Sequence, residues 1–319
     1  MTASLKVTLL AGGVGGAKMA EGFAALDDVE LTVIGNVADD DEFHGLWVSP
    51  DIDTMIYTLS GRINREQGWG VADEGRRALD TLTELGADTW MFLGDRDFGL
   101  HIYRTQRLRE GARPTHVTQD IAKRFGCPAR IILPTDDRVQ TRVKTADGWL
   151  AFQEYFVKHQ HAVAVEDLAY DGIEDATPTP EALKAIAEAD LIVLAPSNPL
   201  VSIAPILGIP GITEAVQTAA APVYAVSPII GGKVVKGPAD QMMRGLGLRP
   251  DAVGVAGQYA GLAQRLMIDH VDAGFAAEIT NLGVEPVVTD ILMPDLAGKT
   301  RLANEITQMF ANARRGDAA

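Results

Sequence analysis

The sequence predicts an α/β fold: a Rossmann-like, doubly wound and mainly parallel sheet. Short apolar runs recur along the chain, at residues 7–11, 31–34, 89–93, 129–133, 191–194 and 223–226. Their apolar residues are continuous rather than alternating, which is typical of strands covered on both faces. Segments with helical start signals lie between these runs. An alternation of strands and helices favours a doubly wound sheet.

The expected helices have recognisable starts and stops. Residues 73–86 begin at Asp73, have helical apolar spacing and stop at Gly86. Residues 180–189 begin with a proline, whose missing N–H costs nothing at the first helical position. Residues 300–315 predict an amphipathic helix.

One stretch departs from this alternation. Residues 142–156 have the pattern of two strands around Asp147-Gly148, a pair that favours a tight turn. We therefore expect a small β-hairpin excursion from the main sheet, in an inserted region at about residues 140–178. The chain shows no internal repeat, low-complexity tract or clear linker, so we expect residues 1–319 to form a single elaborated domain.

Composition and charge exclude several classes of partner. The formal net charge of −15 argues against nucleic acid, because phosphate backbones are bound by clustered Lys and Arg. No apolar run is long enough to span a membrane, and no signal-like stretch precedes the first strand. The single cysteine, Cys127, excludes an intrachain disulfide and a thiolate zinc cluster. We expect a cytoplasmic protein with no membrane partner.

A glycine-rich segment, GGVGGAK at residues 12–18, follows the first expected strand. A nicotinamide dinucleotide loop requires a third glycine where this chain has Lys18, and Ala17-Lys18-Met19 also fails the Walker pattern. The glycines still leave backbone N–H groups free to approach an anion at a helix N-terminus, and Lys18 adds positive charge. We interpret the segment as a phosphate loop. A tight turn that needs glycine only for packing is the alternative.

Clustered carboxylates follow the second expected strand, at residues 39–42 and at Asp51 and Asp53. Such a cluster is either a solvated loop or a cation site, and oxygen ligands favour magnesium bridging phosphates. Asp51 and Asp53 share one side if the segment is extended, with a helix beginning at Thr54. This favours the cation site. The pair Asp136-Asp137 has the same two interpretations.

Two later segments, residues 194–207 and 225–240, follow apolar runs and are rich in Ser, Asn, Pro and Gly. Their hydroxyl and amide groups can contact a phosphate or a base, and glycine allows close approach of the backbone. Ordinary turn chemistry is the alternative, because these residues dominate turns. Strand ends in such sheets meet at one edge, which favours a shared site.

These residues carry a family resemblance. The blocks GGVGGAK, DDDEFHGLWVSPDIDTMIYTLSG, GWG, LGDRDFGLHIYRTQRLREG, ILPTDDRVQT, APSNPLVSIAPILGIPGI and VSPIIGGKVVKGPADQMM run in order from residue 12 to about 243. Through them the chain resembles the 2-phospho-L-lactate transferase family, the phosphoenolpyruvate or phospholactate transferases of deazaflavin coenzyme F-420 biosynthesis. VSPDIDT, the PSNP block and SPIIGG are far more specific than the glycine loop. The last seventy residues match less clearly.

The resemblance implies a Mg²⁺-dependent cytoplasmic enzyme, which we expect to be a homodimer. It implies transfer of phosphoenolpyruvate or 2-phospholactate from the guanosine-diphosphate-activated form. The acceptor is the ribityl hydroxyl of 7,8-didemethyl-8-hydroxy-5-deazariboflavin, and GMP is released. The first-loop variant, with Val14 and Gly16, slightly favours the enolpyruvate form. The alternative is a nucleotide-sugar-binding regulatory protein of the same superfamily without transfer activity.

The resemblance also implies site residues. Asp53 and Asp40 are the expected catalytic residues, and Asp40, Asp53 and Asp51 the expected metal ligands, with Asp39 a weaker candidate. The deazaflavin is expected at Asp53, Phe92 and Arg96, although core packing explains Phe92 equally well. His101 is interpreted as structural. The expected nucleotide- and phosphate-binding residues are Gly12, Gly13, Gly15, Gly16, Lys18, Ser197, Asn198, Ser227 and Gly231.

Overall fold

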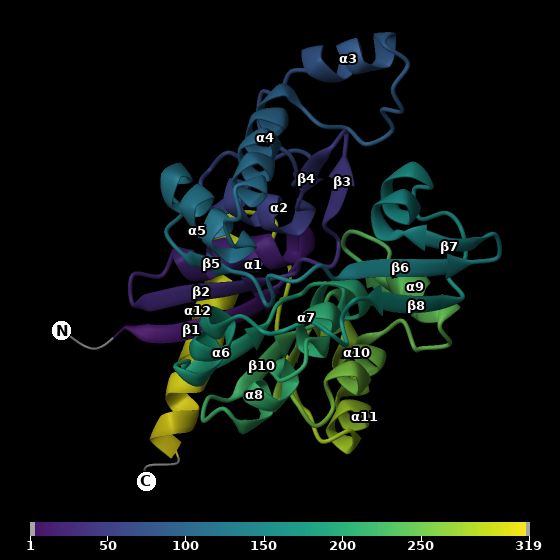
Figure 1. The fold of residues 1–319 in the computed structure, drawn as a ribbon. Coiled ribbons are helices and arrows are strands. Elements are labelled where there is room, and N and C mark those ends of the chain that lie inside the picture. Colours follow the sequence, from purple (N-terminus) through teal and green to yellow (C-terminus); the bar gives the residue numbers. More distant parts are fainter. Residues whose placement is uncertain (1–3, 317–319) are drawn as a thin grey trace.

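The computed structural model describes residues 4–316, and within them a seven-stranded parallel sheet forms the centre of the molecule (Figure 1). Its order is β14-β13-β10-β9-β1-β2-β5. The strands are β1 (Leu5–Ala11), β2 (Val29–Gly35), β5 (Arg130–Ile132), β9 (Leu191–Leu194), β10 (Val223–Val226), β13 (Arg265–Ile268) and β14 (Glu285–Val288). From β1 the chain proceeds outward to β2 and β5, and then returns to β9 before proceeding the other way. The predicted Rossmann-like fold is confirmed.

Helices cover both faces of this sheet, which explains why the strands are continuously apolar. Successive residues of β1 belong to different cores: Leu9 packs in one and Leu10 in the other. The Leu9 face is covered by α1 (Gly13–Ala24), α2 (Pro50–Leu59), α5 (Pro114–Phe125) and α12 (Leu296–Gly316). The Leu10 face is covered by α6 (Pro180–Ala187), α7 (Ala204–Gly208), α8 (Ile212–Thr218), α9 (Ala239–Gly245), α10 (Ala252–Tyr259) and α11 (Ala276–Asn281).

The strand expected at residues 89–93 is wrong. These residues form the loop between α3 (Arg77–Glu84) and α4 (Asp95–Arg109). Leu93 fills a small separate core with Leu79 and Phe98, and Figure 1 shows α3 set apart from the central sheet, beyond α4. The run is apolar because it packs in this core, and periodicity alone cannot distinguish that from a strand. The helix α3 is also shorter than residues 73–86, because Asp73 lies in a turn with a φ of +53°.

The predicted hairpin is confirmed, as β6 (Gln140–Thr145) and β7 (Gly148–Ala151), with β8 (Asp167–Asp171) pairing on the other side of β6. Its two turn residues are Ala146 and Asp147, one position earlier than expected. The second strand ends at Ala151 rather than near Phe156. Phe152 and Phe156 stack with ring centroids 5.6 Å apart, and this four-residue spacing suits the helical turn η1 (Glu154–Lys158).

The remaining elements are short. They are β3 (Asp41–Phe43), β4 (Leu46–Val48), β11 (Ile229–Ile230), β12 (Lys233–Val234), η2 (Pro199–Ile203) and η3 (His270–Phe275). Over residues 4–316, no single helix is long and apolar enough to cross a membrane. The bent pair Pro199–Gly208 and Ile212–Thr218 passes that test by length and composition, and its residues Ile206 and Ile212 are buried in the Leu10-face core.

Candidate active site

The glycine loop after β1 and the PSN segment after β9 meet at the carboxyl edge of the sheet. These two strands are neighbours at the point where the chain reverses its direction across the sheet, the usual place for a ligand crevice. Ser197 Oγ donates to the carbonyl of Gly12 at 2.7 Å and accepts from the Gly12 N–H at 3.1 Å. The structure therefore brings together two segments that are 185 residues apart.

The glycines of the loop allow close packing. A Cβ at Gly15 would lie 2.1 Å from the Pro196 carbonyl oxygen, and one at Gly16 would lie 2.9 Å from Ser197 Oγ. Gly13 begins α1 with a φ of +59°. The packing interpretation therefore holds. The phosphate interpretation stays a prediction, and it is compatible with these contacts because they fix the α1 N-terminus at the crevice. The first N–H groups of a helix and its dipole attract anions.

Lys18 lies on α1, half-buried, and it has no hydrogen bond or ion pair recorded within residues 4–316. Burial lowers its pKa, and the nearby charge of Lys299 adds to this. Burial also lowers the pKa of Lys236, with a contribution from Lys18. Lys299 pairs with Glu21 at 2.6 Å. Two cations, Lys18 and Lys236, are thus near each other beside the glycine loop, and an anion there is favoured.

Asp51 and Asp53 do not share a side as expected. Helix α2 begins at Pro50 rather than at Thr54, since proline suits the first helical position. Both aspartates therefore lie in the first turn of a helix, where residues two apart face different directions. Asp51 accepts from Asn36 Nδ2 at 3.0 Å, and the nearby Gly13 N–H favours its charged form. Its carboxylate thus lies at the N-terminus of α1.

Three buried carboxyl groups here lack full compensation, meaning that their hydrogen bonds and nearby positive charges do not offset the cost of burying an ionised group. Asp39 and Asp40 are each buried with one oxygen, Oδ1, that has no hydrogen-bond partner in the part of the chain described. Burial raises the pKa of Asp39 well above its usual range, and the charges of Asp51 and Asp40 raise it further. Burial raises the pKa of Asp51 to about 6, although Asn36 and Gly13 oppose this. Such a group favours protons or a cation.

Asp40 is held by the β3–β4 hairpin. Its Oδ2 accepts from Ser49 Oγ at 2.7 Å and from Trp47 Nε1 at 3.1 Å. Burial nevertheless raises the pKa of Asp40 to about 8. A cavity of about 210 Å³ adjoins this residue, and its wall is largely apolar. Its lining includes Val37, Trp47, Leu108, Leu133, Val139, Asp136 and Asp137.

Asp53 faces α4, where a positively charged side chain offsets its charge. Both of its oxygens accept from the Arg104 guanidinium, one of them from Nη1 at 3.1 Å. The two side chains are 6% and 3% exposed, so this ion pair is almost fully buried. Arg104 Nη1 also contacts His101 Nδ1 at 3.2 Å. Because arginine only donates, Nδ1 must accept, so His101 is neutral with its proton on Nε2.

Arg104 was missed from the sequence. A signal was present: Asp97, His101 and Arg104 recur at helical spacing in the block LGDRDFGLHIYRTQRLREG. Polar residues at this spacing share one helix face, and all three are buried. Burial lowers the pKa of His101 to about 4, which agrees with the structural role expected for it.

Phe92 and Arg96 lie at the junction of α3 and α4. Phe92 packs in the small core there, under the Arg76 guanidinium at 5.5 Å from the ring centroid. Arg96 Nη1 donates to the Ala72 carbonyl at 2.8 Å, and its backbone N–H donates to Glu74 at 2.5 Å. Core packing thus accounts for Phe92. A deazaflavin role for either residue stays a prediction.

Three further residues predicted to bind the nucleotide form hydrogen bonds within the protein. Asn198 Oδ1 accepts from the Leu200 N–H at 2.9 Å, and Ser227 Oγ accepts from the Ile229 N–H at 3.1 Å. The Gly231 N–H donates to the Asp272 carboxylate at 3.1 Å. Turn chemistry accounts for the bonds of Asn198 and Ser227, whereas the Gly231 bond joins segments 41 residues apart. Nucleotide binding by these residues stays a prediction.

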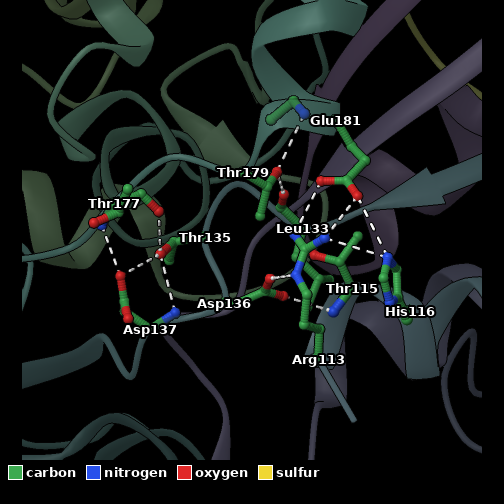
Figure 2. Close-up of polar contacts among 11 residues, drawn as sticks. Arg113, Thr115, His116, Leu133, Thr135, Asp136, Asp137, Thr177, Thr179 and Glu181 are labelled. Atoms are coloured by element: carbon green, nitrogen blue, oxygen red, sulfur yellow. Dashed lines mark hydrogen bonds and ion pairs between the residues drawn. The ribbon is translucent and has the colours of Figure 1, made fainter.

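Asp136 and Asp137 have structural partners (Figure 2). Asp136 accepts from Arg113 Nε and from the Thr115 N–H, both at 2.7 Å, so it ties β5 to the start of α5. Asp137 accepts from the Thr177 N–H at 2.7 Å, which ties the same segment to the approach to α6. Neither the solvated-loop nor the cation-site interpretation is needed for this pair.

No group of three or more His, Cys, Asp or Glu side chains in residues 4–316 is arranged to hold a metal. Magnesium commonly takes only one or two carboxylates, together with substrate phosphates and water. The unpartnered oxygens of Asp39 and Asp40, and the position of Asp51 at the phosphate loop, fit such a partial set of ligands. The oxygens of Asp53 are engaged by Arg104.

Comparison with known proteins gives consistent results. The family model described as 2-phospho-L-lactate transferase CofD matches residues 7–293. A Streptomyces griseus protein named phosphoenolpyruvate transferase is 40% identical over 317 residues, covering 97% of this chain and 100% of that protein. A Methanopyrus kandleri protein named 2-phospho-L-lactate transferase is 38% identical over 309 residues, covering 96% of this chain and 98% of that protein.

A crystal structure of a upf0052-family protein from Bacillus halodurans has a TM-score of 0.62. It covers 96% of this chain and 99% of that one at 16% identity, so it supports the fold alone. The sequence relatives extend over nearly the whole chain, which favours the transferase over the regulatory alternative. The chain therefore belongs to the 2-phospho-L-lactate transferase CofD family and is a transferase.

Proposed function

We propose that this transferase moves a phospho-acid moiety, phosphoenolpyruvate or 2-phospholactate, from its guanosine-diphosphate-activated form to a deazaflavin. The acceptor is the ribityl hydroxyl of 7,8-didemethyl-8-hydroxy-5-deazariboflavin, the product is a coenzyme F-420 precursor, and GMP is released. One observation carries the proposal: the α1 N-terminus lies against buried Asp51, whose charge interacts with Asp39, and Asp39 and Asp40 each keep a buried oxygen without a partner among the residues described. The names of the relatives supply the substrate class.

The chemistry balances without a covalent enzyme intermediate. The acceptor oxygen attacks the phosphorus that carries the acid, the bond from that phosphorus to the oxygen of GMP breaks, and GMP leaves. The hydroxyl proton passes to a carboxylate. Such a reaction depends mainly on positioning and on neutralising phosphate charge. The N–H groups of the glycine loop and Lys18 suit the diphosphate.

The carboxylates divide into two roles in this proposal. Asp51 and Asp40, with Asp39 beside them, would hold Mg²⁺, which neutralises charge on the diphosphate when bound. Asp53 would orient the acceptor hydroxyl, because its fixed carboxylate is an acceptor-only group. Asp40 lies near enough for its charge to interact with Asp53, so it is the second candidate for the catalytic role, as the alternative to its role as a metal ligand.

The proposal also names the acid that is transferred and the assembly of the protein. Relatives with similar identity carry the enolpyruvate and the lactate names, so the first-loop variant at Val14 and Gly16 is our reason for proposing enolpyruvate. We also propose a homodimer acting in the cytoplasm. The net charge of −15 is our reason for proposing no nucleic-acid partner.

The test is a direct assay of the full chain. The protein is incubated with Mg²⁺, the deazaflavin precursor and each guanylyl-activated acid, and the products are weighed by mass spectrometry. We expect GMP together with a deazaflavin heavier by the phospho-acid, and no product when EDTA removes the metal. Absence of both GMP and the mass gain with every donor would overturn the proposed function.

A further inference from the structure

One buried polar face of α4 packs against α2 and β4. It consists of Asp97, His101, Arg104 and Thr105, each less than one-tenth exposed. None of these side chains takes part in the chemistry proposed above. A helix that packs only for stability would ordinarily present apolar residues to its neighbours. The polar face therefore needs an explanation.

The contacts of this face lead to the two candidate catalytic carboxylates. Arg104 binds both oxygens of Asp53. Thr105 Oγ1 accepts from the backbone N–H of Trp47 at 2.8 Å, and the indole of Trp47 donates to Asp40 at 3.1 Å. Adjacent residues of one helix thus reach Asp53 directly and Asp40 through Trp47.

The Arg104 guanidinium, which binds Asp53, is also hydrogen-bonded to His101. His101 Nδ1 accepts from Arg104 Nη1, so the guanidinium is held from within its own helix. One turn along α2, Tyr57 donates to Asp97 at 2.7 Å and closes the interface. The titratable groups that interact with Asp53 are therefore Arg104, His101 and Asp97 from α4, Tyr57 from α2 and Asp40 from the segment after β2.

Stability alone does not account for this arrangement. A buried ion pair is often no more stabilising than well-packed apolar side chains of similar volume. A planar guanidinium that binds two carboxylate oxygens, however, fixes the orientation of the carboxylate, which a lysine ammonium does not. What the pair supplies is a defined direction for Asp53.

We propose that Arg104 is a positioning residue that, itself held by His101, keeps the Asp53 carboxylate oriented toward the acceptor hydroxyl. This inference rests on the proposed function and adds a residue to it. Arg104 does not touch the substrates in this scheme. It acts through Asp53, and its loss affects the transfer step rather than binding of the nucleotide donor.

The test compares Arg104→Gln and Arg104→Lys with Arg107→Gln. Arg107 lies three residues further along α4, and among the residues described its side chain pairs only with exposed Glu110, so it is a matched control. The measurements are kcat for transfer, the dissociation constant and stoichiometry of donor binding with Mg²⁺, and the melting temperature. For Arg104→Gln we expect kcat to fall about 100-fold, the scale of a misplaced reacting group. Donor binding keeps one site per chain and an unchanged constant.

Arg104→Lys gives an intermediate kcat, and Arg107→Gln matches the wild type. A folded Arg104→Gln protein with wild-type kcat would overturn the inference. So would a loss of donor-binding stoichiometry that parallels the loss of kcat, because that indicates a purely structural role. If Arg104→Gln does not fold, Arg104→Lys decides: a tenfold lower kcat with normal donor binding supports the inference, and a kcat within twofold of wild type contradicts it.

The two proposals fail in different ways. A wild-type protein that releases no GMP overturns the proposed function, and the positioning role with it. An active wild type whose Arg104 variants are equally active overturns the positioning role alone.

Discussion

Two pairs of adjacent aspartates follow neighbouring strands, and in sequence they look alike. Asp39-Asp40 comes after β2, Asp136-Asp137 comes after β5, and Asp40 and the second pair line one cavity. Asp136 and Asp137 accept hydrogen bonds from Arg113 and from backbone N–H groups. Asp39 and Asp40 each retain a buried oxygen without a partner among the residues described.

This difference distinguishes a structural carboxylate from a candidate functional one. Compensated carboxylates hold segments together, whereas uncompensated ones store an unfavourable interaction that a ligand can relieve. Asp53 lies between these cases, because Arg104 compensates its charge and also fixes its direction. If compensation distinguishes the two aspartate pairs, substitutions near Asp39-Asp40 should alter catalysis and metal-dependent binding, and a substitution in Asp136-Asp137 should alter only stability.

The largest effect is expected at Asp53. Asp53→Asn removes the charge that orients the acceptor and leaves Arg104 without its partner, so transfer should slow about 10³-fold. Donor binding with Mg²⁺ should persist, which calorimetry measures on the same sample. Turnover equal to wild type would show that a different carboxylate acts on the acceptor.

The second-largest effect concerns the free energy of unfolding of the metal-free protein and its dependence on pH. The pKa of Asp40 is raised to about 8 and that of Asp51 to about 6, so the folded chain holds protons that the unfolded chain releases above about pH 4. The free energy of unfolding should therefore decrease as the pH rises from about 4 to about 8. Each such proton contributes about 1.4 kcal/mol per pH unit.

Urea unfolding between about pH 6 and pH 8 checks this prediction. We expect a loss of about 2 kcal/mol over that interval without metal and a smaller loss with Mg²⁺, which favours the ionised carboxylates. Asp40→Asn should reduce the metal-free dependence, with Asp39 and Asp51 supplying the part that remains. A free energy of unfolding that increases over this range would contradict the assignment of uncompensated carboxylates.

The third effect concerns the carboxylate at the phosphate loop. The Asp51 carboxylate lies beside Gly12 and Gly13, so it competes with a phosphate for the α1 N-terminus when no cation lies between them. Asp51→Asn should therefore bind GDP about tenfold more tightly than wild type in EDTA, and should gain less from Mg²⁺. Calorimetric titration measures both. Equal metal-free affinities would show that Asp51 does not oppose the nucleotide.

The sequence predicted the fold well because the fold depends on burial. Strands β1, β2, β9 and β10 are continuously apolar since helices cover both faces, and that pattern is visible locally. The same reasoning failed at residues 89–93, where an apolar run fills a small core. The sequence also predicted that the loops after these strands lie at one edge, because parallel strands end there, and the contact of Gly12 with Ser197 agrees with this.

The arrangement of the carboxylates was harder to predict. The start of α2 at Pro50 rather than Thr54 turns Asp51 and Asp53 apart, so a shift of four residues reverses the conclusion about which groups share a side. The pair of Asp53 with Arg104 joins residues 51 positions apart on two helices. Helical spacing placed Arg104 on one face with His101, but only packing of α4 against α2 supplies its partner.

The smallest effect is expected at the structural pair, and it sharpens the comparison most. Asp136→Asn weakens the contact with partly exposed Arg113 and the bond to the Thr115 N–H at the start of α5, so the free energy of unfolding should fall by about 1 kcal/mol. Turnover per folded chain and GDP affinity with and without Mg²⁺ should stay within twofold of wild type. If Asp136→Asn instead changes the metal dependence of GDP binding, the two aspartate pairs share one cation site, and compensation does not separate structural from functional carboxylates in this protein.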